Sequence, residues 1–218
     1  MAEAPRVSRK RQGERSRQVI VEAATRLFAQ KGYRATSIAD LTAATGLTRG
    51  AFYHHFDAKD ALFRAVVDHV RTTWAQTVGA QISASDDALE QLASLIGGHA
   101  RLISSRPELC LVITGLSEEI RGSEPELADA LHGVYRELIA VVEQLLAAGQ
   151  DAGQVRRDID PHLVAIDIVG LLRGVSCFGV LADLGLDVER TLAGIRPVLI
   201  DGLRPRTGGG RACVPTDS

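Results

Sequence analysis

Aromatic residues are scarce in this chain of 218 residues: they make up 4% of it, whereas apolar residues as a whole make up 45%. A core of this composition consists mainly of Leu, Val, Ile and Ala side chains. These residues recur with helical periodicity, and no convincing strand or internal repeat interrupts them. The sequence therefore predicts an all-α protein of about nine packed helices rather than a β-sandwich.

Catalytic and metal-binding motifs are missing as well. The chain contains no P-loop, GxSxG elbow, HExxH or GxGxxG after a strand, and many enzymes are recognised through these motifs. Cysteines are few, far apart and odd in number, which fits neither a zinc site nor a disulfide framework. They are Cys110, Cys177 and Cys213. We expect a protein that is not an enzyme and that has no cofactor or metal.

Long hydrophobic runs are limited to one segment, residues 163–184. As a transmembrane helix it would place Asp167 and Arg173 in lipid, at a cost of roughly 2.5–3.5 kcal/mol each. A buried helix in a soluble bundle avoids that cost, so no membrane partner is expected. The basic N-terminus lacks the apolar run of a signal peptide, which favours a cytoplasmic protein.

Charge is distributed unevenly. The whole chain has a formal net charge of -2, but residues 1–56 contain ten Arg or Lys and four acids, a charge of +6, which leaves -8 for the remainder. Such asymmetry indicates one end that meets a polyanion and a body that does not. Residues 1–13 are expected to be a disordered basic arm that lies along a DNA backbone or enters its minor groove. A merely solvated tail is the alternative.

Residues 36–56 have the pattern of a helix-turn-helix, with two short helical runs around Gly46. The apolar residues of both runs are expected to face inward: Ile38, Leu41, Leu47, Ala51, Phe52 and Phe56. The residues turned away from them can hydrogen-bond to phosphates or base edges: Thr48, Arg49, Tyr53 and His54. The alternatives are that Tyr53 is a core aromatic and that His54 is an ordinary surface residue.

Helix signals continue through residues 57–204. Capping residues and prolines predict helix starts at Asp57, Asp86 or Asp87, Pro107, Glu124 or Pro125, Pro161 and Asp187. Residues 149–160 form a predicted polar loop, the apolar helix is expected to end near Gly185, and Pro197 is expected to kink the last helix or shift its start. Residues 205–218 read as a disordered tail.

Within residues 15–62, the motif F-Y-x-H-F followed by x-x-K-x-x-L resembles the TetR family of bacterial transcription regulators. The resemblance implies an all-helical homodimer, with a three-helix DNA-binding domain at residues 14–56 and an effector-binding and dimerisation domain at residues 57–204. It further implies that Thr48, Arg49 and Gly50 begin the recognition helix. Tyr53, His54 and Lys59 match positions that touch phosphate or base, and Thr36 or Ser37 would cap the supporting helix and direct it at the DNA backbone.

The central helices, residues 60–180, are expected to hold the effector. Bulky or polar residues on otherwise apolar faces are the candidates, although each of them also suits a plain core: Trp74, His99, Leu102, Cys110, Ile113, Thr114, Tyr135, Arg173 and Phe178. With so few aromatics, an aromatic cage for a cation is not expected. A small, lipid-like, acyl or otherwise largely apolar effector fits better.

The last two helices are the expected dimer interface, since their apolar content exceeds what one layer could cover. Its candidate residues are Leu163, Ile166, Gly170, Gly174, Leu192, Ile195 and Leu199. The two glycines would let helices approach closely across the interface, or would only ease packing within one subunit.

Together these features predict a homodimeric repressor that binds a palindromic operator in double-stranded DNA. A ligand would displace the helix that starts at Asp57, so that the two recognition helices no longer lie about one DNA turn apart, roughly 34–36 Å. A transcriptional activator, or a helical small-molecule-binding module without DNA binding, are the alternative functions.

Overall fold

A computed structural model describes residues 4–82, 85–120, 124–181 and 185–206. Within these ranges the chain forms nine α-helices, one short 3-10 helix and no strand, so the predicted all-α fold is confirmed. The helices are α1 (Ala4–Lys31), α2 (Ile38–Thr45), α3 (Arg49–His55), α4 (Lys59–Thr77), η1 (Gly79–Gln81), α5 (Ala88–Ser105), α6 (Pro107–Glu119), α7 (Pro125–Asp151), α8 (Pro161–Leu181) and α9 (Val188–Leu203).

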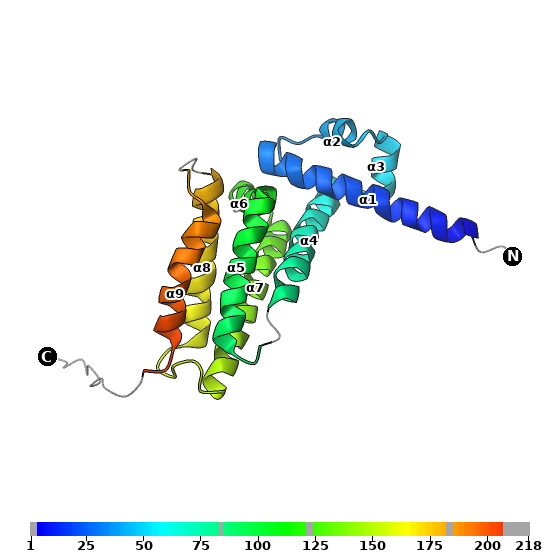
Figure 1. The fold of residues 1–218 in the computed structure, drawn as a ribbon. Helices are drawn as coiled ribbons and strands as arrows, with labels where there is room; N and C mark the ends of the chain where they lie inside the picture. The colour runs from blue at the N-terminus through cyan, green and yellow to red at the C-terminus, as the bar shows by residue number, and fades with distance from the viewer. Residues whose placement is uncertain (1–3, 83–84, 121–123, 182–184, 207–218) are drawn as a thin grey trace.

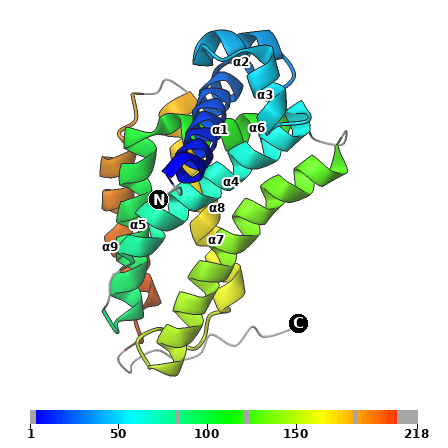
Figure 2. The same cartoon turned by 90° about the vertical axis from the view of Figure 1, so that its right-hand side faces the viewer.

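The first three helices form a head that lies across one end of a bundle made by the others (Figure 1). Helix α4 leads from the head into the bundle, and α1 also packs against α6. Helices α8 and α9 lie side by side at the edge farthest from α4, while α7 runs obliquely past α4 and α8 (Figure 2). The head therefore touches the bundle through α4 and α6.

The scarce aromatic residues gather in and beside the head. Six of the nine aromatics lie between residues 28 and 63. The Tyr33 ring meets Phe28 and Phe63 edge to face, with centroid distances of 5.4 and 5.2 Å. Phe52 and Phe56 are buried in the same core. Because aromatic side chains bury a large area each, a few of them suffice to hold this small three-helix unit together.

The chain is helical from Ala4, so the prediction of a disordered arm is wrong for residues 4–13; residues 1–3 lie outside the described ranges. This segment is rich in Arg, Lys, Gln and Glu, which have high helix propensity. Pro5 falls in the first turn, where proline is tolerated. Helix α1 ends at Lys31, and the following Gly32 has a φ of +84°, a left-handed conformation that glycine adopts readily.

Several predicted helix starts are confirmed: Thr48, Asp87 and Asp187 are N-caps, and Pro107 and Pro125 open their helices. Asp57 is not a cap, because α4 begins after Ala58 without any side-chain cap. Helix α7 continues past residue 149, the predicted start of the polar loop, and ends at Asp151. The polar composition of these residues therefore did not mark the end of the helix. The predicted end of α8 near Gly185 adjoins residues 182–184, which are outside the described ranges. Pro197 lies within an unbroken α9.

Helix α8 is the one described helix that is long and apolar enough to cross a membrane, judged by length and composition alone. Only 28% of its apolar segment, Pro161–Gly179, is buried inside the subunit, so the expectation of a buried helix is wrong. Its position at the edge of the bundle leaves Leu163, Ile166 and Phe178 exposed. An apolar surface of this kind indicates contact with something outside the single subunit.

Candidate nucleic-acid interface and effector cavity

The outer face of α3 carries the predicted DNA-contacting residues. Thr48 caps the helix by accepting a hydrogen bond from the Ala51 N–H at 3.2 Å, while Phe52 is buried beneath it. Tyr53 is 44% exposed and is therefore not a core aromatic. The Arg49 guanidinium lies 5.8 Å from the Tyr53 ring centroid. Four exposed positions complete the face: Thr48, Arg49, Gly50 and His54. All these exposed residues are accessible to a partner outside the subunit.

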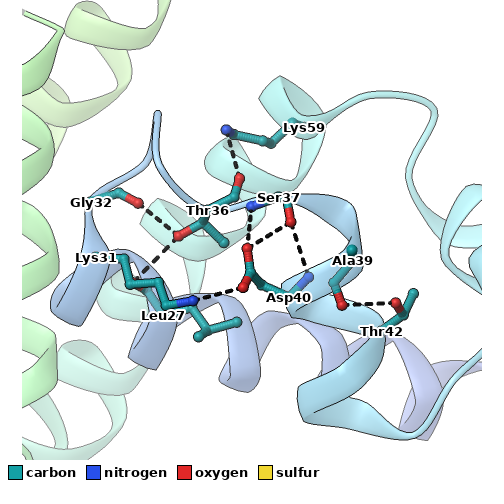
Figure 3. A network of polar contacts seen from close by, with 9 residues as sticks. All are labelled: Leu27, Lys31, Gly32, Thr36, Ser37, Ala39, Asp40, Thr42 and Lys59. Atoms are coloured by element: carbon teal, nitrogen blue, oxygen red, sulfur yellow. Dashed lines mark hydrogen bonds and ion pairs between the residues drawn. The ribbon is translucent and has the colours of Figure 1, made fainter.

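Helix α2 begins with a capping box (Figure 3). The Ser37 hydroxyl oxygen accepts from the Asp40 N–H at 3.1 Å, and the Asp40 carboxylate accepts from the Ser37 N–H at 2.8 Å. Lys31 of α1 donates to the same carboxylate at 2.7 Å. These hydrogen bonds, the one from Lys31 foremost, hold the pKa of Asp40 well below its usual range. The carboxylate therefore stays ionised and ties α1 to α2.

Thr36 is fully buried, and its hydroxyl donates to the Gly32 carbonyl at 2.7 Å. Its side chain is directed into the α1–α2 turn, as Figure 3 shows, so its hydroxyl does not face a partner outside the subunit, and a DNA contact through this side chain is not expected. Of the two predicted caps, Ser37 is the one that the structure selects. Sequence alone left this open, because both hydroxyls can cap a helix and only the turn geometry separates them.

Lys59, the first residue of α4, is engaged within the subunit. Its ammonium donates to the Thr36 carbonyl at 2.9 Å and the Arg34 carbonyl at 3.3 Å, and lies 4.4 Å from the Tyr33 ring centroid. Burial lowers the pKa of Lys59. The Tyr33 hydroxyl donates to the Asp60 carboxylate. Burial, and to a smaller extent this carboxylate, raises the pKa of Tyr33. These contacts join the start of α4 to the head, and a phosphate contact by Lys59 remains a prediction.

Inside the bundle, helices α4 to α8 enclose a cavity of about 220 Å³. Eight of the nine predicted effector residues line it: Trp74, His99, Leu102, Cys110, Ile113, Thr114, Tyr135 and Arg173. Phe178 does not, because it is 59% exposed on the outer face of α8. Sequence reasoning missed Arg71, Glu137 and Ser176. Their polarity gave no sign that they line a cavity, since charged and hydroxyl residues usually face solvent.

One buried polar chain crosses the apolar wall of the cavity. The Trp74 indole N–H donates to His99 Nδ1 at 3.4 Å, and His99 Nε2 lies 3.1 Å from the Ser176 hydroxyl. Because an indole can only donate, Nδ1 must be the acceptor, so Nε2 carries the hydrogen and donates to Ser176. Burial lowers the pKa of His99 to about 4. The imidazole is therefore neutral near pH 7.

Charged residues stand at two places on the cavity lining. Arg71 of α4 donates to Glu137 of α7 at 2.8 and 2.5 Å, and also to Asp68 at 3.0 Å. Arg173 of α8 lies with its guanidinium 5.0 Å from the Tyr135 ring centroid. Burial raises the pKa of the Cys110 thiol to about 12, so this lining thiol stays protonated and is a weak nucleophile.

The predicted dimer residues fall into two groups. Leu163 and Ile166 are 58% and 41% exposed, and a methyl group added at Gly170 or Gly174 would meet nothing within 4 Å in the subunit. Packing inside one subunit therefore does not require these glycines. Leu192 is fully buried within the subunit, where α9 packs on α5, so its assignment to a dimer interface is wrong. Ile195 and Leu199 are half-buried, and exposed Phe178 and Val198 extend the surface.

The head and bundle match known proteins. Residues 20–66 match the profile described as bacterial regulatory proteins, tetR family, and residues 75–202 match the YsiA-like protein, C-terminal region. The transcriptional repressor DhaR of Mycobacterium sp. (strain GP1) is 25% identical over 194 residues, 88% of this chain and 93% of the relative. The repressor AcnR of Corynebacterium efficiens is 31% identical over 161 residues, 73% of this chain and 79% of the relative.

Among solved structures, the fatty acid degradation regulator FadR from Bacillus halodurans aligns with a TM-score of 0.75 and 24% identity, covering 86% of this chain and 99% of FadR. The likeness extends over both the head and the bundle. The chain is therefore a DNA-binding transcriptional regulator and not an enzyme. It belongs to the TetR family of bacterial transcription regulators.

Proposed function

We propose that the protein is a homodimeric repressor that binds a palindromic operator through α3 and is released when a small, largely apolar effector enters the cavity. The observation that carries the DNA-binding part is the exposed face of α3, where Arg49 and Tyr53 stand on a capped helix within a basic head. An arginine at this place can offer a bidentate contact to guanine.

The cavity supports an apolar effector, because carbon-rich side chains form most of its lining. One relative of solved structure, from Bacillus halodurans, regulates fatty acid degradation, and an acyl chain belongs to the proposed class of ligands. Helix α4 connects the two sites: its start is hydrogen-bonded to the head through Lys59, and its middle lines the cavity through Val70 and Trp74. We infer that a ligand shifts α4, which begins at Lys59, and thereby changes the spacing between the two heads of a dimer.

The outer face of α8 and α9 supports the dimer. Leu163, Ile166, Phe178 and Val198 are all more than 40% exposed on these two helices. A second copy related by a two-fold axis would cover the same residues on both subunits. Linkage then requires that ligand and operator each weaken the binding of the other by the same factor. A cytoplasmic location follows from this function.

Fluorescence anisotropy with a labelled fragment of the gene's own upstream DNA tests the proposal. We expect tight binding at low ionic strength, a steep loss of affinity with salt, and weaker binding to scrambled DNA. Absence of binding to either fragment at low ionic strength would favour the alternative of a ligand-binding module without DNA binding. A reporter gene behind the same fragment separates repression from activation. Deletion of the regulator gene raises reporter expression if the protein is a repressor and lowers it if the protein is an activator.

A further inference from the structure

The polar groups of the cavity converge on one stretch of α8. Arg173 and Ser176 both line the cavity and are three residues apart on the helix, so their side chains are neighbours on one face. Ser176 is 1% exposed, whereas Arg173 is exposed at the edge of the same cavity. A ligand whose apolar part fills the cavity would place its polar end beside this pair.

Both side chains have unused donors. Within the described parts of the chain, no carboxylate forms an ion pair with Arg173, whose guanidinium lies 5.0 Å from the Tyr135 ring centroid. The Ser176 hydroxyl accepts from His99, and its own proton is donated to none of the described residues. The Ser176 proton is buried and calls for an acceptor, because an unmatched buried polar group is costly. The exposed Arg173 guanidinium offers its donors at the edge of the same cavity.

The charge of the lining favours an anion over a cation. Its ionisable charges are Arg71 and Arg173 against Glu137, and His99 is neutral. Glu137 is already bound by two nitrogens of Arg71, so it is not free to hold a cationic ligand. This leaves the positive charge of Arg173 uncompensated.

We propose that the effector is a small apolar acid whose free carboxylate accepts hydrogen bonds from Arg173 and Ser176 while its hydrocarbon part fills the cavity. This rests on the proposed function of the cavity as the effector site. A volume of about 220 Å³ is smaller than that of a typical drug-sized site, and accommodates roughly seven groups the size of a water molecule. Octanoate is therefore a suitable probe.

Trp74 is the only tryptophan of the chain and lines the cavity, so its fluorescence reports binding directly. Octanoate, octanol, octylammonium and octanoyl coenzyme A are titrated into the full-length protein. We expect octanoate to bind at least about tenfold more tightly than octanol, as one charge-assisted hydrogen bond allows. Equal or tighter binding of octanol, of octylammonium or of the thioester would overturn the proposal.

Variants locate the carboxylate. Arg173→Gln is expected to remove the preference for octanoate over octanol without changing the octanol affinity. Ser176→Ala is expected to reduce that preference about fivefold. Arg136→Gln, which removes an exposed arginine bound to Asp129, is the matched control and should behave as wild type. An unchanged preference in Arg173→Gln would also refute the assignment.

Operator binding by the same samples separates the two proposals. If octanol and octanoate release the operator equally well, the cavity is the effector site but the carboxylate assignment is wrong. If no probe changes Trp74 fluorescence, the apolar-acid assignment is wrong, and operator binding then shows by itself whether the repressor function survives.

Discussion

The charge state of His99 is set by its surroundings. Burial lowers its pKa from 6.5 to about 4, so below pH 6.5 the unfolded chain binds a proton that the folded chain excludes. The stability that neutral His99 contributes is thus complete above pH 6.5 and is lost as pH falls toward 4.

We expect urea unfolding to show a fall approaching about 1.4 kcal/mol per pH unit from this group over that window. His99→Gln should have a flatter profile, and exposed His132→Gln should follow wild type. If His99→Gln is as sensitive to acid as wild type, burial does not hold His99 neutral.

Arg49 is the residue expected to distinguish operator sequences. Arg49→Ala should weaken operator binding by about 1–3 kcal/mol and reduce the ratio of specific to non-specific affinity, because a bidentate contact to guanine is lost. Anisotropy titrations with operator and scrambled fragments measure both quantities. Arg101→Ala, an exposed arginine on α5 that bonds to Gln81, serves as the control. An unchanged ratio would show that Arg49 contacts only the DNA backbone.

Single residues were predictable where a local motif decides their position. The cap at Thr48 and the exposed face of α3 follow from spacing within a few residues, whereas spacing narrowed the cap of α2 only to Thr36 or Ser37. Leu192 and Phe178 were assigned to the wrong surfaces because both are apolar residues on amphipathic helices. Which apolar side faces a neighbour depends on where that neighbour packs, and a single sequence does not contain this information.

Among the elements, α2 depends on its capping box. Ser37→Ala removes the hydroxyl that accepts from Asp40 N–H and should lower the free energy of unfolding by about 1 kcal/mol. For a chain of this size that corresponds to a melting temperature lower by about 2–4 °C, measured by circular dichroism. Thr42→Ala on the same helix removes only a bond to the Ala39 carbonyl and should change little. Equal effects of the two substitutions would argue against the capping role.

Helix α6 gives a second connection between cavity and head. It lines the cavity through Cys110, Ile113 and Thr114, and at its last residue the Glu119 carboxylate accepts from the Arg34 N–H at 3.0 Å. Glu119→Ala should leave ligand affinity for the free protein unchanged but reduce the factor by which ligand weakens operator binding. Calorimetry with and without operator measures that factor, with exposed Asp151→Ala as the control. If ligand weakens operator binding by the same factor in Glu119→Ala as in wild type, α6 does not couple the cavity to the head, and the coupling is assigned to α4 alone.

At the scale of the whole molecule, the exposed apolar face of α8 and α9 is expected to pair with a second copy. Ile166→Asp and Val198→Asp place a charge on that face and should convert the dimer to single subunits, as measured by light scattering after size exclusion. Val19→Asp, which alters an apolar residue 38% exposed on α1, should remain dimeric. Wild-type protein that is already monomeric would contradict both the interface and the repressor proposed above.

The fold class and the positions of most helices could be predicted, because helical periodicity and caps are local signals. The continuation of α1 to Ala4 could not, since a highly charged segment is equally typical of a disordered arm and of an exposed helix. The cavity was predicted as a set of residues rather than as a volume, because its walls come from five helices far apart in sequence.

The helical N-terminus changes how its charge can act on DNA. Six basic residues lie between positions 4 and 17, on a helix that extends beyond α2 and α3 in Figure 1. An α-helix is about 10–12 Å across, whereas the minor groove is about 6 Å wide. As a rod, this segment is therefore too wide to enter the minor groove. Insertion into the minor groove would require its first turns to unwind, and the helical content would then decrease when operator binds.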